Sequence, residues 1–282
     1  MKIVVAMDSL KGSLTSIEAG EAIRKGILNV DASANVVVKP LADGGEGTTE
    51  ALVSGMGGVL CTQRVTGPIG LAVEATYGIL PDQNMAVIEM AQAAGLPSVP
   101  KEKRNPLYTT TYGVGEMIKA CIEKGCRKFI VGIGGSATND AGIGMLKALG
   151  YRFLDSKGQD VGEGGQVLER VHHIDGTNVL AELKVCEFQV ACDVNNPLYG
   201  PNGAAFIYGP QKGATPEIVA RLDAGLKHFA KVTSDFLGED FSQVKGAGAA
   251  GGLGFGFMAF LGGKLESGIQ IILKETQLEE AI

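Results

Sequence analysis

One stretch constrains the fold of this chain more than any other, namely residues 128–150 (KFIVGIGGSATNDAGIGMLKALG). It opens on an apolar run at 129–131, which is typical of a buried strand. Glycines and small hydroxyl residues follow, and apolar residues then recur at helical spacing from Ile143 to Leu149. Gly150 is suited to cap the end of that helix. The stretch therefore predicts a strand, a glycine-rich turn and a helix.

The turn in this stretch has the composition of an anion-binding loop. Glycines let backbone N–H groups approach an anion, and the start of a helix adds partial positive charge. The candidate residues are Gly134, Gly135, Ser136, Thr138, Asn139 and Asp140. Asp140 could also hold a metal or accept a proton. An equally weighted alternative is a tight turn in which Asn139 or Asp140 only caps the helix. The stretch matches neither G-x-x-x-x-G-K-[ST] nor G-x-G-x-x-G, so a phosphate site here would be of another kind.

Other expected strands also end in polar turns. These strands cover 2–6, 35–39 and 187–192, and the charged residues that follow them are Asp8, Lys11, Asp43, Glu46 and Asp193. Open α/β sheets place ligand groups at the carboxyl ends of their strands. Mg²⁺ needs only one or two carboxylates beside water and phosphate oxygens. Solvated turns and helix caps are the alternative interpretation of the first two turns.

A further glycine-containing segment, 209–214, precedes a helix expected at 216–237. It supplies Gln211 and Lys212. Because helix starts favour negative charge, this segment could also face an anion.

Between residues 60 and 90 the pattern changes to short strands joined by hairpin-like turns. The expected strands are 63–66, 72–78 and 85–90. This meander differs from the strand–helix rhythm before it. We therefore expect two domains, one formed by residues 1–62 and the other by residues 63–282, with the last residues of the second returning to the first as an alternative.

Composition excludes several classes of protein. The net charge of −6 and the lack of a dense Lys/Arg cluster argue against a nucleic-acid partner. The five cysteines are odd in number and lack zinc-site spacing, which indicates reduced thiols in a cytoplasmic protein. Residues 246–263 carry no charge but are rich in glycine, so we expect a buried helix or loop rather than a membrane span.

The chemistry that these strand ends favour is phosphoryl transfer. They carry Asp, Lys, Ser or Thr beside glycine, whereas the chain has only three histidines and no Ser-His-Asp or Cys-His arrangement. Phosphoryl transfer depends on positioning and charge neutralisation more than on a covalent nucleophile. An NAD-binding oxidoreductase is disfavoured, because no strand is followed by the dinucleotide fingerprint.

Six segments together closely resemble the type I glycerate kinases of bacteria, in the order of that family and through essentially the whole chain. They are MDSLKGSLTSIEAGEAIRKGI, PLADGGEGTTEAL, TTYGVGEMIKACIEKG, FIVGIGGSATNDAGIGMLKALG, CDVNNPLYGPNGAAFIYGPQKGA and GAGAAGGLGFGFMAFLGGKLESGI. The resemblance implies two α/β domains. One is flavodoxin- or Rossmann-like, the other is a mixed domain with antiparallel strands inserted into it, and the active site lies in the cleft between them. It also implies ATP- and Mg²⁺-dependent phosphorylation of D-glycerate to 2-phosphoglycerate, with 3-phosphoglycerate as the other possible product.

The resemblance further implies roles for the candidate residues. Lys11 would neutralise phosphate charge, and Asp8 would hold substrate or act as a base. Asp193 would serve Mg²⁺ or the glycerate hydroxyl, and the metal ligands would be Asp43 and Glu46. The residues that bind substrate or phosphate would be Ser9, Ser13, Gly134, Gly135, Ser136, Thr138, Asn139, Asp140, Gln211 and Lys212.

The chain departs from the family pattern in two places. Leu10 stands where the family often has Phe, and family members continue past the point where this chain ends. We therefore expect a form that lacks a C-terminal segment, which normally completes the first domain. Two further hypotheses follow: a family member that binds ligand or dimerises without turnover, and a kinase for another small hydroxy acid. A homodimer is one possible assembly.

Overall fold

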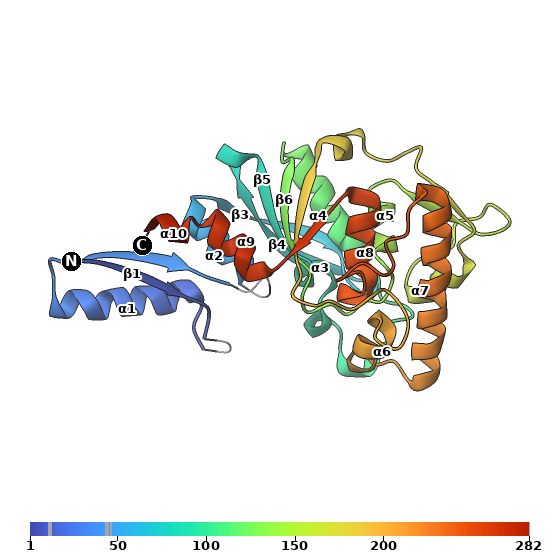
Figure 1. Ribbon diagram of the computed structural model, residues 1–282, viewed down its shortest axis with the longest axis horizontal. Coiled ribbons are helices and arrows are strands. Elements are labelled where there is room, and N and C mark those ends of the chain that lie inside the picture. Colours follow the sequence, from blue (N-terminus) through green and yellow to red (C-terminus); the bar gives the residue numbers. More distant parts are fainter. Residues whose placement is uncertain (11–12, 43–44, 46, 282) are drawn as a thin grey trace.

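A computed structural model describes residues 1–10, 13–42, 45 and 47–281 of the chain (Figure 1). The strands are β1 (Lys2–Met7), β2 (Asn35–Pro40), β3 (Val59–Thr66), β4 (Ala72–Leu80), β5 (Met85–Glu89), β6 (Lys128–Gly132), β7 (Arg152–Leu154), β8 (His173–Asp175), β9 (Glu187–Ala191) and β10 (Lys264–Glu266). The α-helices are α1 (Ser16–Val30), α2 (Thr48–Met56), α3 (Ala91–Ala94), α4 (Tyr112–Glu123), α5 (Ile143–Ala148), α6 (Ala204–Tyr208), α7 (Pro216–Leu237), α8 (Ala249–Leu261), α9 (Gly268–Glu275) and α10 (Leu278–Ala281).

The largest sheet has the strand order β10-β9-β6-β5-β4-β3. The strands β10, β9, β6 and β5 run parallel, whereas β4 pairs antiparallel with both β5 and β3. Every residue of β5 is buried, as expected of a strand that is covered on both faces. The prediction of a mixed α/β fold with antiparallel strands is thus confirmed. The small pair β7–β8 is antiparallel and forms a separate sheet.

Helices cover both faces of this sheet because neighbouring side chains of a strand point to opposite sides. Val87 packs with Leu52 of α2 and Ile272 of α9 on one face. Ile88 belongs to the larger core on the other face, which includes Met117 of α4. Two helices that are far apart in the sequence, α2 and α9, therefore share one face of the sheet.

The strands β1 and β2 form a separate parallel pair that extends to one side of the molecule with α1 (Figure 1). The Lys39 ammonium of β2 donates a 2.9 Å hydrogen bond to the Thr276 carbonyl, just past α9. The division that we expected at residues 62 and 63 falls inside β3, whose residues all pair with β4. Helix α2, which precedes that division, packs on the large sheet. The two-domain division itself stays a prediction.

The stretch at 128–150 contains the expected strand β6 and helix α5, joined by the loop 133–142. The segment 246–263 contains the largely buried helix α8, as expected. Ala250, Gly251 and Gly252 at its start have positive φ angles. A Cβ atom on Gly251 would lie 2.0 Å from the Thr138 carbonyl oxygen, so glycine is required for this close approach. In the described part of the chain, no helix is both long enough and apolar enough to cross a membrane.

Two helix glycines provide a matched test of this packing. A Cβ atom on Gly115 of α4 would lie 2.3 Å from the Met145 carbonyl oxygen of α5, whereas nothing lies within 4 Å of one on Gly26 of α1. We expect Gly115→Ala to lower the free energy of unfolding by about 1–3 kcal/mol, because the backbone must shift. Gly26→Ala should raise it by about 0.5–1 kcal/mol through helix propensity. Urea unfolding followed by circular dichroism measures both, and equal effects would contradict the α4–α5 contact.

Candidate active site

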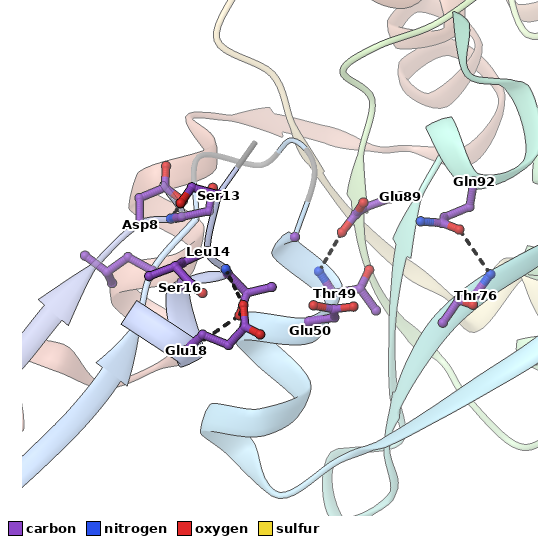
Figure 2. Close-up of a pocket in the computed structure, with 14 residues that line it drawn as sticks. Asp8, Ser13, Leu14, Ser16, Glu18, Thr49, Glu50, Thr76, Glu89 and Gln92 are labelled. Carbon is purple, nitrogen blue, oxygen red and sulfur yellow. Dashed lines mark hydrogen bonds between the residues drawn. The ribbon is translucent and has the colours of Figure 1, made fainter. Parts of the chain in front are cut away.

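Three adjacent cavities follow the carboxyl edge of the large sheet, where β5, β6 and β9 end together. The acidic cavity (about 480 Å³; Figure 2) is lined by Asp8, Ser9, Ser13, Glu18, Thr49, Glu50, Thr76, Glu89, Gln92 and their neighbours. The middle cavity (about 390 Å³) is lined by Glu74, Glu89, Gln92, Ser98, Gly134, Gly135 and others. The lysine cavity (about 410 Å³) is lined by Gly134, Gly135, Ser136, Asp193, Gln211, Lys212, Ala249 and others. Because neighbouring cavities share lining residues, they form one trough along the sheet edge.

Lys212 is the central residue of the lysine cavity. It ends a short 3₁₀ helix at Pro210–Lys212 and is only 1 % exposed. Its ammonium donates hydrogen bonds of 2.7 Å to the Ser136 hydroxyl and 2.6 Å to the Thr138 carbonyl. It thereby joins residue 212 to the loop after β6, across more than seventy positions of the chain. The predicted residues Ser136 and Lys212 are therefore brought together.

Burial controls the charge of this lysine. Desolvation lowers the pKa of Lys212 from 10.5 to about 7, although the nearby Asp140 charge opposes the shift. The two oxygens that accept these hydrogen bonds, the Ser136 hydroxyl and the Thr138 carbonyl, are neutral. An anion in the lysine cavity would favour the charged form. The site is therefore suited to a ligand that brings negative charge with it.

Backbone hydrogen bonds hold the loop after β6 in place. The Gly135 carbonyl accepts from the Leu96 amide at 2.8 Å, and the Ala137 amide donates to the Ala94 carbonyl at 2.9 Å. Gly135 has a φ of +71°, a conformation that favours glycine. Gly134 and Gly135 are exposed on the trough, so their backbone is accessible to a ligand.

Three other predicted residues of this loop lie behind the cavity wall. The side chains of Thr138, Asn139 and Asp140 are fully buried. Asp140 accepts hydrogen bonds from the Thr111 amide and hydroxyl and from the amides of Gly142 and Gly144. Burial raises the pKa of Asp140, and these donors oppose that rise. Asp140 thus accepts hydrogen bonds from two amides at the start of α5, although the N-cap residue of this helix is Gly142 and not Asn139 or Asp140 as the helix-cap alternative expected. Its burial favours a supporting role over contact with a ligand.

The predicted residues of the first motif lie in the acidic cavity. Asp8 follows β1, and its Oδ1 accepts a 2.6 Å hydrogen bond from the Ser9 amide. Ser9 and Ser13 line the same cavity (Figure 2). Lys11, Asp43 and Glu46, predicted as a phosphate-neutralising group and as metal ligands, lie outside the described residues.

Asp193 and Gln211 line the lysine cavity with Lys212. Asp193 follows β9, and its Oδ1 accepts a 3.3 Å hydrogen bond from the Gly268 amide at the start of α9. The predicted residues that line a cavity therefore fall into two groups. Those of the first motif lie in the acidic cavity, and those of the later motifs lie in the lysine cavity. The sequence pattern did not predict this division.

Glu89 lines both the acidic and the middle cavity, but it was not among the predicted site residues. Glu89 ends β5, is 5 % exposed, and accepts a 2.8 Å hydrogen bond from the Thr49 amide at the start of α2 (Figure 2). Burial raises the pKa of Glu89, the amides of Thr49 and Gly47 oppose the rise, and the Glu50 charge adds to it. The pattern that singled out Asp8 and Asp193, a carboxylate at the carboxyl end of a strand, also applies to Glu89.

No group of three or more His, Cys, Asp or Glu side chains that could hold a metal ion occurs among the residues described. Mg²⁺ bound together with a nucleotide needs only one or two protein carboxylates, and the rest of its shell comes from phosphate and water. Asp8 after β1 and Asp193 after β9, which both line the trough, fit that donor set.

The lowered pKa of Lys212 predicts a pH-dependent stability. Between about pH 7 and pH 10.5 the unfolded chain binds one proton more at this residue than the folded chain. The free energy of unfolding of the wild type should therefore rise with pH, relative to Lys212→Met, by up to about 1.4 kcal/mol per pH unit. Below pH 7 the difference should be constant. Urea unfolding from pH 6 to pH 9 measures this slope.

The control for this experiment is Lys227→Met, which removes an exposed lysine from α7. Its profile should run parallel to that of the wild type. A parallel profile for Lys212→Met as well would contradict the burial of an ionisable amine at residue 212.

Comparisons with known proteins identify relatives of this chain. The family model of the glycerate kinase family matches residues 3–282. Glycerate 2-kinase of Escherichia coli (strain K12) is 49 % identical over 282 residues, which are 100 % of this chain and 74 % of that protein. Glycerate kinase of Halalkalibacterium halodurans is 48 % identical over 280 residues, which are 99 % of this chain and 74 % of that protein.

A solved structure supports the same relationship. The crystal structure of a Salmonella typhimurium LT2 protein described as a glycerate kinase 2 superposes with a TM-score of 0.97 at 46 % identity. The match covers 100 % of this chain and 75 % of that one. These likenesses confirm the resemblance carried by the sequence motifs, and the chain belongs to the glycerate kinase family.

Proposed function

We propose that this chain transfers the γ-phosphoryl group of ATP to a hydroxyl of D-glycerate and forms 2-phosphoglycerate. The observation that carries the proposal is the buried Lys212, which stands beside an exposed glycine loop in a trough that is acidic at its other end. Both substrates are anions with oxygen atoms that need N–H donors. The relatives named glycerate kinase support the choice of substrate.

The lysine cavity supplies the contacts to negative charge. Lys212 offers its ammonium, and Gly134 and Gly135 offer backbone that a phosphate or carboxylate can approach closely. Ser136 and Gln211 add side-chain hydrogen-bonding groups on the same wall. The buried Thr138, Asn139 and Asp140 support this wall from behind.

Carboxylates come from both ends of the trough, Asp8 from the acidic cavity and Asp193 from the lysine cavity. Asp8 and Asp193 are proposed to orient the glycerate hydroxyl and the metal-bound nucleotide, with Ser9 and Ser13 as hydrogen-bonding neighbours of Asp8. From their places in the sequence, Lys11 is proposed to neutralise phosphate charge, and Asp43 and Glu46 to hold Mg²⁺. Mg²⁺, when bound, would neutralise charge that develops on the phosphate oxygens.

The proposed reaction would take place in a cleft between two domains. We propose that β1, α1 and β2 belong to a Rossmann- or flavodoxin-like domain beginning at residue 1, and that the mixed domain of the large sheet is inserted into it. Asp8 follows β1 and Glu89 ends the large-sheet strand β5, yet both line the acidic cavity. A site built from two such units could close around ATP and exclude water.

Coupled detection of ADP from MgATP, with and without D-glycerate, tests the proposed reaction. Glycerate-dependent turnover is the expected result. The ³¹P NMR signal identifies the product, because the phosphorus couples to one carbon-bound proton in 2-phosphoglycerate and to two in 3-phosphoglycerate. Faster turnover of tartronate or L-glycerate would favour another hydroxy acid as substrate. Ligand binding without turnover would favour the non-catalytic hypothesis. A homodimer stays a prediction, which light scattering can check.

Lys212→Met should lower kcat/KM by roughly 10- to 150-fold, because hydrogen bonds to a charged group contribute about 1.5–3 kcal/mol. Wild-type affinity for ATP or glycerate should also weaken as the pH rises above 7, since the free protein then loses the ammonium. Steady-state kinetics and calorimetry measure these effects. The exposed Lys227→Met is the control and should keep wild-type kinetics. A Lys212→Met enzyme with wild-type kinetics would contradict the role of the ammonium.

A further inference from the structure

We infer that Glu89 is the group that accepts the proton of the substrate hydroxyl, a role that rests on the proposed function. The position of Glu89 in the large sheet supports this role. Glu89 lies at the carboxyl end of β5 and pairs in register with Gly132 at the end of β6. The loop that carries Gly134, Gly135 and Ser136 begins directly after Gly132. Glu89 is thus a neighbour of the proposed anion-binding loop.

Glu89 can contact a ligand in either of two cavities. It lines both the acidic and the middle cavity, and the middle cavity continues to Gly134 and Gly135. A small hydroxy acid whose charged group contacts the glycine loop could therefore direct a hydroxyl toward Glu89. Figure 2 shows the Glu89 carboxylate on the wall of the acidic cavity, directed toward Thr49, whose amide donates to it.

Burial distinguishes Glu89 from the other candidate bases. Among the described carboxylates that line the three cavities, Glu89 is the one that is buried. Asp8 is half-buried and Asp193 is exposed. A buried carboxylate has a raised pKa and is a stronger proton acceptor than an exposed one.

The charged surroundings of Glu89 act in the same direction. The described charged groups that line its two cavities with it are Asp8 after β1, Glu18 of α1, Glu50 of α2 and Glu74 of β4. All four are acidic, and the Glu50 charge adds to the rise in the pKa of Glu89 that burial causes. The opposing influence comes from the amides of Thr49 and Gly47 at the start of α2. The start of α2 therefore holds the Glu89 carboxylate in place, while burial and the Glu50 charge keep its pKa raised.

The chemical step balances with Glu89 as the proton acceptor. The glycerate hydroxyl oxygen forms a bond to the γ-phosphorus of ATP, and the bond from that phosphorus to the β–γ bridging oxygen breaks. ADP leaves with the electron pair of the broken bond. The hydroxyl proton passes to the Glu89 carboxylate and is later released to solvent.

Glu89→Gln separates this role from a purely structural one. The amide oxygen of Gln can still accept the hydrogen bond from the Thr49 amide, so α2 keeps its partner. It cannot accept a proton. We expect kcat to fall by about 10²- to 10⁴-fold, as is typical when a general base is lost. The KM for ATP should change by less than about threefold, because binding is retained.

The pH profile provides a second readout. Wild-type kcat/KM should fall as the pH drops below the raised pKa of Glu89, because the protonated acid cannot accept the hydroxyl proton. This acid limb should be absent from E89Q. Glu89→Asp keeps a carboxylate and should retain the limb with a lower kcat, which also covers the case in which E89Q does not fold.

Glu187→Gln is the matched control. Glu187 is an exposed glutamate that begins β9, and it pairs with Lys128 at the opposite edge of the same sheet. Its removal should leave kcat and the acid limb unchanged. An E89Q enzyme that is folded and retains wild-type kcat and pH profile would overturn the inference and leave the proposed function standing.

Calorimetric binding of D-glycerate tests the inference without turnover. Wild-type affinity should weaken toward acid pH, as the proton on Glu89 removes an acceptor for the hydroxyl, whereas the affinity of E89Q should not weaken toward acid pH. Identical pH dependence in both proteins would overturn the role of Glu89. Wild-type protein that neither binds glycerate nor turns it over would overturn the proposed function, and this role with it.

Discussion

The Lys212 ammonium, buried against the Ser136 hydroxyl and the Thr138 carbonyl, is the interaction on which the trough depends. It connects the segment before α7 to the loop after β6 through two hydrogen bonds. Burial lowers its pKa to about 7, because neutral oxygens satisfy its hydrogen bonds and the nearby Asp140 charge only partly opposes the desolvation. A bound anion would complete the charge balance. The burial that lowers the pKa of Lys212 therefore also favours an anionic ligand.

The rest of the trough complements this cation with carboxylates. Asp193 lies in the lysine cavity, on the β9 side of the glycine loop, and Glu89 lies on its β5 side. Parallel strands impose this arrangement because their carboxyl ends share one edge, and the loop after the central strand is flanked by those of its neighbours. Phosphoryl transfer needs such a division, with donors for the phosphate and acceptors for the hydroxyl within one cavity system.

Sequence patterns predicted the elements of this edge better than their contacts. The strand, loop and helix at 128–150 follow from hydrophobic periodicity and glycine placement, and the structure contains all three. The same pattern could not separate Ser136, which faces the lysine cavity, from Asp140, which lies behind it. Both are small polar residues near glycines, and only packing decides which side chain faces solvent. Glu89 was missed because its strand reads as part of an antiparallel meander, whereas β5 pairs parallel with β6.

The sequence by itself determined the family of this chain, its mixed α/β class and most of the segments that line the trough, because these depend on local patterns and long motifs. Tertiary structure decided which polar residues are buried, how far the pKa values of Lys212 and Glu89 depart from their ordinary ranges, and which carboxylate lies beside the glycine loop. Those properties arise from desolvation and from contacts between residues far apart in the chain, for example the 2.8 Å hydrogen bond from Thr49 to Glu89. No local pattern encodes them.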